Sequence, residues 1–277
     1  KSTLALALLG LHPSNGDLRL SGRAWSADVA ANKALRRSVQ VVFQDPFSSL
    51  SPRMTVEEIV GEGLRVHQPG LSVAQRQLRV VQALADVGMS QAQFPRLLQR
   101  YPHEFSGGQR QRLAIARCLA TKPELIIADE IVSALDVSIQ AQIVNLLLKI
   151  QKETGLSFIF VTHDVAVARY VGHRVAVMYL GNVVEILPAD SLPEAAEHPY
   201  TIALLSAVPS MNPTAKEQRV VLQGEVPSPI DMPSGCAFST RCPAVMDICR
   251  TDRPVLKISN ISKGDHQVAC HLNKGAK

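Results

Sequence analysis

Residues 105–130 read FSGGQRQRLAIARCLATKPELIIADE and place a glycine-rich helix start ahead of an apolar run that ends in two carboxylates. Gly107 and Gly108 have no side chains, so the backbone at this point can approach a phosphate closely. The helix that they begin, predicted over residues 109–120, directs unpaired N–H groups and the positive end of its dipole toward such an anion. This half of the stretch therefore predicts a phosphate clamp.

The second half of the stretch predicts two carboxylates with different roles, one that binds a metal ion and one that acts as a general base. Its apolar run, Leu125–Ala128, is typical of a buried parallel strand, and the carboxyl end of that strand presents Asp129 and Glu130. One carboxylate can hold Mg²⁺ through water, and the other can activate a water molecule.

Six motifs of this chain resemble those of the ATP-binding-cassette (ABC) ATPases, in the order in which that family has them. FSGGQ resembles the signature motif, and LIIADE resembles the Walker B strand. Lys1-Ser2-Thr3 resembles the end of a Walker A loop, Gln44 in VVFQD the Q-loop, SALD at residues 133–136 the D-loop, and His163 in FVTHD the H-loop. Each motif alone has a structural explanation, such as a turn before a helix, but their spacing relative to one another favours the family.

The resemblance implies that the chain binds ATP and Mg²⁺. Lys1 would lie between the β- and γ-phosphates, and Thr3 would lie near the α-phosphate. The hydroxyl of Ser2 would bind Mg²⁺.

Four further residues are implied to act at the same nucleotide. Asp129 would position the hydrated Mg²⁺, and Glu130 would be the general base for the attacking water. Gln44 would contact the γ-phosphate and the metal, and His163 would hold the γ-phosphate and order the water. The resemblance thus gives Glu130 and His163 the catalytic roles.

The signature motif is implied to bind the nucleotide of an opposite subunit, so that each site is complete only in a head-to-tail dimer. The residues assigned to nucleotide contacts through the signature and the D-loop are Ser106, Gly107, Gly108, Gln109 and Asp136.

The chain departs from the family pattern in two places. It begins at the phosphate-loop lysine, and the glycine-rich turn that would supply a nest of backbone N–H groups is absent. We therefore expect a fragment of a longer polypeptide that alone binds ATP weakly or not at all. After Glu130 the family usually has a proline, which stiffens the turn out of the strand, whereas this chain has Ile131-Val132.

The fold class implied is α/β: a P-loop nucleotide-binding domain over residues 1–187, with a helical subdomain at about 54–105 that docks on a membrane partner in the family. A capping box is predicted at Thr55 and Glu58. The elements predicted are helices at 2–10, 71–87 and 138–153, strands at 39–43 and 156–162, the latter buried, and a hairpin of 174–179 and 182–187 around Gly181.

Residues 188–277 form a second predicted region, which is rich in proline and cysteine. HPYTIALLSAVP at 198–209, followed by GEVPSP and SGCAFSTRCP, resembles the C-terminal extension of oligopeptide and dipeptide importer ATPases. This similarity narrows the family to the peptide, nickel and related importer group.

Four of the five cysteines lie in this extension, as Cys236, Cys242, Cys249 and Cys270. Disulfides are disfavoured in a cytosolic ATPase, so the cluster suggests a metal site. The C-x2-C pairs of zinc ribbons are absent, and the looser spacing suits a four-iron, four-sulfur cluster, which some importers of this group carry. Unmetallated thiols and zinc remain the alternatives.

Composition excludes some function classes. No apolar run approaches the roughly 18 to 20 residues of a membrane span, and a net charge of +5 with 4% aromatic residues does not favour nucleic-acid binding. The favoured function is the ATP-hydrolysing subunit of a peptide-type importer on the cytoplasmic side of a bacterial inner membrane. Its partners would be a second ABC ATPase domain, transmembrane permease subunits and, indirectly, a substrate-binding protein.

Two other functions stay open from the sequence. One is an ABC ATPase without a transport role, although the tail matches importer ATPases instead. The other is a catalytically incomplete fragment that contributes only a signature half-site. The cargo cannot be inferred, because selectivity lies largely in the membrane and binding-protein partners.

Overall fold

The computed structural model of this protein describes residues 1–26, 32–208, 220–259 and 265–273. It divides into two compact units, an N-terminal unit of residues 1–163 and a C-terminal unit of residues 164–277. The boundary between the two units, at 163/164, therefore lies before the predicted domain boundary at 187/188, because the hairpin at 174–188 packs with the chain that follows it. The extent of the nucleotide-binding domain stays a prediction.

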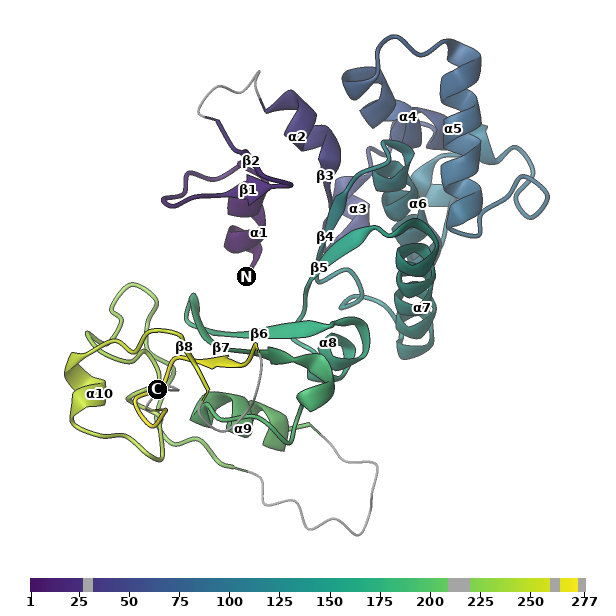
Figure 1. Ribbon diagram of the computed structural model, residues 1–277. Helices are drawn as coiled ribbons and strands as arrows, with labels where there is room; N and C mark the ends of the chain where they lie inside the picture. Colours follow the sequence, from purple (N-terminus) through teal and green to yellow (C-terminus); the bar gives the residue numbers. More distant parts are fainter. Residues whose placement is uncertain (27–31, 209–219, 260–264, 274–277) are drawn as a thin grey trace. The chain divides into compact units, whose positions relative to one another are not determined.

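A parallel sheet positions the candidate site in the N-terminal unit (Figure 1). Its order is β3 (Val39–Val42), β4 (Leu125–Asp129) and β5 (Ser157–Val161), with β4 in the middle. The register pairs Val42 with Ala128 and Asp129 with Val161, so the three carboxyl ends lie at one edge. The three predicted strands are confirmed.

Burial differs between these strands. Ile126 and Ile127 of β4 are fully buried, as expected for a central strand. The prediction that residues 156–162 form a buried strand is wrong in part, because β5 pairs on one side only in the described sheet and leaves Ser157 and Ile159 exposed.

Short elements precede the sheet. Helix α1 (Ser2–Leu8) confirms the predicted helix and ends ahead of Gly10, whose φ of +64° favours glycine. A hairpin of β1 (Arg19–Leu20) and β2 (Arg23–Ala24) and helix α2 (Lys33–Ser38) lead into β3.

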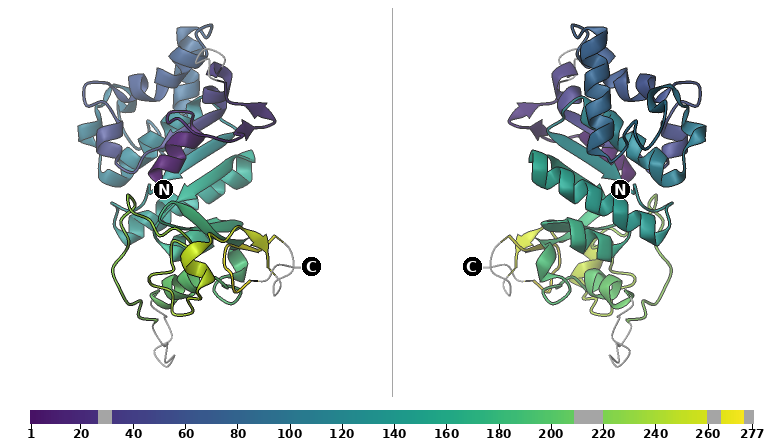
Figure 2. Two further views of the ribbon diagram at one scale, coloured as in Figure 1. Left: turned by 90° about the vertical axis from the view of Figure 1, so that its left-hand side faces the viewer. Right: turned by 90° about the vertical axis from the view of Figure 1, so that its right-hand side faces the viewer.

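A helical region follows, as predicted. Helix α4 (Val56–His67) begins with the predicted capping box, in which Thr55 N donates to Glu58 Oε2 at 2.8 Å and Glu58 N donates to Thr55 Oγ1 at 3.4 Å. Helix α5 (Val73–Asp86) and the turns η1 (Leu97–Gln99) and η2 (Pro102–Glu104) complete the region. Both long helices pack against α6 (Gly107–Ala120), as Figure 2 shows from two sides.

Helix α7 (Val137–Thr154) lies between β4 and β5 in the chain and ends at Gly155, which adopts a left-handed φ of +69° as a C-cap. Its buried residues Ile143, Leu147 and Ile150 recur at helical spacing. The predicted helix at 138–153 is therefore confirmed, and these residues form the stripe that faces the core.

The C-terminal unit is built on an antiparallel sheet of order β6-β7-β9-β8. The predicted hairpin forms from β6 (Arg174–Tyr179) and β7 (Asn182–Pro188), with Gly181 at a φ of +78° in the turn. Strands β8 (Lys257–Ile258) and β9 (Gln267–Val268) extend the sheet, and were not predicted. The remaining elements are α8 (Val165–Val171), η3 (Ala189–Ser191), α9 (Pro199–Ser206) and α10 (Ile248–Thr251).

None of the helices within the described residues is long and apolar enough to cross a membrane.

Candidate active site

Three predicted site residues converge on the carboxylate of Glu130. Lys1 Nζ lies 3.3 Å from Glu130 Oε1 and also donates to the carbonyl oxygen of Thr162 at 3.0 Å. Gln44 Nε2 donates to Glu130 Oε2 at 3.3 Å, and His163 Nδ1 lies 3.3 Å from the same oxygen. The fold thus gathers residues from positions 1, 44, 130 and 163 around one carboxylate.

The sheet explains this convergence. Gln44 follows β3 by two residues, Glu130 follows β4 directly, and His163 follows β5 by two. Since ligand chemistry in open α/β sheets lies beyond the carboxyl ends of the strands, these side chains occupy the expected edge. Lys1 reaches the edge from the N-cap position of α1.

The backbone at Glu130 is strained. Its φ is +49°, a left-handed conformation that costs a non-glycine residue about 1 to 3 kcal/mol and that clusters at functional sites. Glu130 N donates to Val161 O at 2.8 Å, and Ser133 Oγ donates to Glu130 O at 2.8 Å. These bonds hold Glu130 in place, and Ile131, which follows it at the position where the family usually has a proline, is buried.

Asp129 offers an oxygen for a hydrated metal ion. Its side chain is buried, and Oδ1 has no hydrogen-bond partner among the described residues. An ionised oxygen left without a donor is costly in a protein interior, and a water of hydrated Mg²⁺ would satisfy it. The hydroxyl-bearing Ser2 and Thr3 lie in the first turn of α1, next to Lys1. These residues fit Mg²⁺.

The signature motif begins helix α6. Ser106 is its N-cap: Ser106 Oγ accepts from Gln109 N at 3.4 Å, and Gln109 Oε1 accepts from Ser106 N at 2.9 Å. This capping box fixes the geometry of the helix start. Asp136 is the N-cap residue of α7 and is exposed, without a side-chain capping bond.

The two signature glycines differ in their surroundings. A Cβ atom at Gly108 would lie 2.6 Å from Ile139 Cγ2 on α7, whereas one at Gly107 would lie 3.6 Å from Leu135 Cδ2. Gly108 is therefore required where α6 and α7 approach each other, a role in addition to the predicted phosphate contact.

Sequence comparison places the chain in a family. The profile of the ABC transporter family matches residues 1–133, and that of the oligopeptide/dipeptide transporter C-terminal region matches residues 184–249. A probable peptide ABC transporter ATP-binding protein of Sinorhizobium fredii is 50% identical over 100% of this chain and 76% of its own length. The chain belongs to the ABC transporter ATP-binding proteins.

Other proteins similar to this ABC ATPase belong to the same family. A putative oligopeptide transport ATP-binding protein of Bacillus subtilis is 46% identical over 100% of the chain and 83% of its own length. Among solved structures, cbiO1 from Clostridium perfringens, part of the ABC transporter complex cbiONQ, has a TM-score of 0.62 and 28% identity over 73% of this chain and 76% of its own.

A dimeric ATP-binding cassette in a post-hydrolysis state, bound to ADP and Pi, is also similar. Its TM-score is 0.57, with 29% identity over 68% of this chain and 79% of its own. The α/β P-loop fold and the ATP-hydrolysing activity predicted from the motifs are thereby confirmed.

The sequence did not predict that Ser133 contacts two residues of this site. Ser133 Oγ lies 3.4 Å from Gln44 Nε2 while it donates to the Glu130 carbonyl. Its position at the start of the D-loop motif SALD was the available signal, but its contacts depend on the turn that follows β4.

The four extension cysteines give the predicted iron–sulfur cluster no support. Within the described residues, no group of three or more His, Cys, Asp or Glu side chains is arranged to hold a metal ion. Burial raises the pKa of the Cys236, Cys242 and Cys270 thiols, which favours their protonated form at neutral pH. The fifth cysteine, Cys118, is a buried thiol of the core, and burial raises its pKa to about 11.

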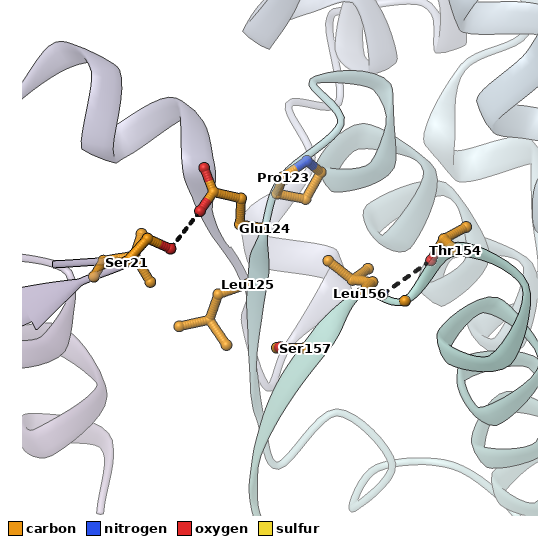
Figure 3. Close-up of a pocket in the computed structure, with 9 residues that line it drawn as sticks. Ser21, Pro123, Glu124, Leu125, Thr154, Leu156 and Ser157 are labelled. Carbon is orange, nitrogen blue, oxygen red and sulfur yellow. Dashed lines mark hydrogen bonds between the residues drawn. The ribbon is translucent and has the colours of Figure 1, made fainter. Parts of the chain in front are cut away.

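A surface cavity of about 450 Å³ lies at the opposite end of the strands (Figure 3). Glu124, Leu125 and Ser157 line it at the amino ends of β4 and β5, and Glu124 Oε2 there accepts from Ser21 Oγ at 2.7 Å. Because it lies away from the carboxyl ends of the strands, it is not part of the active site.

Proposed function

We propose that this ABC ATPase hydrolyses ATP to drive a peptide importer. The observation that carries the proposal is the convergence of Lys1, Gln44 and His163 on Glu130. The relatives whose names state peptide or oligopeptide transport, and the match to the oligopeptide/dipeptide transporter C-terminal region, support the cargo class.

Glu130 is the general base in this proposal. Its carboxylate accepts the proton of the attacking water, and the His163 ring beside it orients that water and the γ-phosphate. The Lys1 ammonium group binds the β- and γ-phosphates, which places a fixed cation where charge develops. Gln44, in contact with the same carboxylate, positions the water.

Mg²⁺ would neutralise phosphate charge when it is bound. We assign it to the Ser2 hydroxyl, the Gln44 amide oxygen and, through water, Asp129. Thr3 would contact the α-phosphate from the first turn of α1.

The signature half of the site would act on a second cassette. The start of α6, with Ser106, Gly107, Gly108 and Gln109, would bind the γ-phosphate held by a partner domain, and Asp136 would lie at the same interface. The capping box at Ser106 and the exposed N-cap at Asp136 support this assignment. So does the dimeric form of the cassette bound to ADP and Pi.

The wider assembly follows from the same family. The subunit would lie peripherally on the cytoplasmic side of the inner membrane, bound to transmembrane permease subunits that a substrate-binding protein supplies with peptide. The solved relative that is part of a larger transporter complex supports such an arrangement.

A mixed-subunit experiment tests both activity and site architecture. We expect Glu130→Gln and Ser106→Arg each to abolish ATP hydrolysis by the transporter reconstituted in vesicles. A transporter that combines one subunit of each kind keeps one intact site, made of a normal Glu130 and the other subunit's normal signature. Peptide-stimulated hydrolysis should reappear in that mixture.

Two results would contradict the proposal. If the mixture stays inactive while the wild-type transporter hydrolyses ATP, the signature does not act across subunits. If peptides fail to stimulate hydrolysis by the wild-type transporter, the cargo class is wrong.

A further inference from the structure

Helix α6 holds the chain on both sides of Gln44. On one side, Cys118 Sγ donates to Val41 O at 3.3 Å. On the other, the guanidinium carbon of Arg110 lies 4.1 Å from the centre of the Phe47 ring, and Arg117 Nη1 donates to Ser49 O at 2.6 Å. Gln44 lies between these attachment points in the sequence.

The short helix α3 (Pro46–Ser49) that follows Gln44 depends on these contacts. A helix of four residues has a single turn, which is unstable in water unless other groups hold it. Asp45 caps its start by accepting from Phe47 N at 2.8 Å, and the Arg117 guanidinium binds the carbonyl at its end. A cation at a helix C-terminus satisfies an unpaired carbonyl and opposes the negative end of the dipole.

The geometry of Arg110 makes its contact directional. Arg110 Nε donates to Pro102 O at 2.8 Å, which holds the guanidinium plane over the ring of Phe47. Arg110 and Arg117 are seven residues apart, two turns of helix, so they lie on the same face of α6. Helix α3 lies along that face (Figure 1).

The same helix begins at the signature motif. Ser106 is its N-cap, one turn before Arg110, while the Gln44 side chain reaches Glu130 Oε2 at 3.3 Å. A continuous 14-residue helix transmits a displacement of its start to the residues along its face. The signature and the base are thus joined through α6, α3 and Gln44.

We propose that Arg110 and Arg117 are positioning residues that couple the signature's contact with the partner's nucleotide to the placement of Gln44 at Glu130. The inference rests on the proposed function. Engagement of the signature would then set the distance of Gln44 from the base, so that each site becomes competent when its own subunit binds the opposite nucleotide.

The test measures ATP hydrolysis by the reconstituted transporter carrying Arg117→Met. We expect kcat to fall on the order of 10-fold to 100-fold, the size found when a positioned group is misplaced, with KM for ATP unchanged because Lys1 is untouched. Arg117→Lys keeps a cationic donor and should recover part of the loss. Phe47→Leu, which removes the ring that Arg110 contacts, is a second variant that should lower kcat and leave KM for ATP unchanged.

Arg112 supplies the matched control. It lies on the same helix and also donates a guanidinium N–H to a backbone carbonyl, Val87 O at 2.6 Å, but its partner lies after α5 and away from Gln44. Arg112→Met should therefore leave kcat close to the wild-type value, even if it lowers the melting temperature as much as Arg117→Met does.

A double-mutant cycle with Gln44→Ala separates positioning from general damage. If Arg117 acts through Gln44, Arg117→Met should cause no further fall in kcat in the Gln44→Ala background. A full multiplicative loss in the double variant would overturn the inference. Absence of hydrolysis by the wild-type transporter would instead refute the proposed function, so the two failures are distinguishable.

Discussion

At the scale of single residues, Gly108 shows that packing alone can require a glycine in a motif whose glycines are predicted to contact phosphate. A Cβ atom there would lie 2.6 Å from Ile139 Cγ2, which is closer than non-bonded contacts of Cβ atoms in proteins. The neighbouring Gly107 has room for a methyl group, since the nearest atom lies at 3.6 Å.

Gly108→Ala is predicted to lower the free energy of unfolding by about 1 to 3 kcal/mol, the usual cost of overpacking a well-packed interior. Gly107→Ala is the control, and it should be neutral or slightly stabilising because alanine favours a helix over glycine. Chemical denaturation of both variants measures the difference.

Removal of the clashing side chain supplies a further check on this prediction. Ile139→Ala in the Gly108→Ala background should cost less than the two single substitutions together. Equal stability of the Gly107→Ala and Gly108→Ala proteins would disprove the packing role.

Glu130 marks the limit of prediction at this scale. Its type and its place after an apolar strand indicate a base, and the structure puts three predicted neighbours around it. Its left-handed backbone could not be predicted, because that conformation depends on bonds to Val161 and Ser133.

At the scale of elements, strand β7 carries a buried carboxylate that joins distant parts of the C-terminal unit. The Glu185 carboxylate accepts hydrogen bonds from Glu197 N at 2.8 Å and from His198 N at 3.2 Å. Its Oε1 atom also lies 2.8 Å from His266 Nε2. It is fully buried, so these partners replace the water that it loses. The bonds fasten the start of α9 and the segment before β9 to β7.

Helix α9 depends on a neutral histidine at its N-cap. His198 is buried and its Nδ1 accepts from Tyr200 N at 3.0 Å. Burial lowers the pKa of His198 to about 4, from an ordinary value of 6.5. Below about pH 6.5 His198 binds a proton in the unfolded chain but stays neutral in the folded chain. The free energy of unfolding therefore falls as the pH falls from that value toward 4.

His198→Asn is predicted to flatten this part of the stability profile. Asparagine is a good N-cap and does not titrate, so the acceptor for Tyr200 N remains while the proton linkage is lost. Thermal unfolding of the wild type and the variant between pH 4 and pH 7 measures the effect. A variant whose stability falls as steeply as the wild type's in that range would show that His198 is not the group responsible.

The elements that sequence patterns predicted well are those with local signals. The strand ending at Asp129 follows from a continuous apolar run, and α4 and α7 follow from a capping box and a terminal glycine. Strands β8 and β9 have two residues each, and β9, which also pairs with β8, joins strand β7 about 80 residues earlier, as the register of Glu185 with Val268 shows. Pairing of that kind leaves no periodic signal in the sequence.

At the scale of the whole molecule, the chain divides into a unit that carries the active site and a unit that carries the extension. The predicted site residues Lys1, Gln44, Glu130 and His163 all lie in the first. The predicted cysteine cluster lies in the second, where the described residues give it no metal-binding arrangement. The motif order could identify the first unit, because ABC chemistry fixes residue types, whereas tail cysteines have no such constraint.

The most direct test of the account is ATP hydrolysis by the Glu130→Gln protein, assembled in its transporter. Glutamine keeps the shape of the side chain but cannot accept the proton of water, so turnover should fall about 100-fold to 10,000-fold while ATP binding persists. Glu124→Gln is the matched control, since that carboxylate flanks the amino end of β4. It should hydrolyse ATP at the wild-type rate. Undiminished turnover by the Glu130→Gln protein would contradict the assignment of Glu130 as the base.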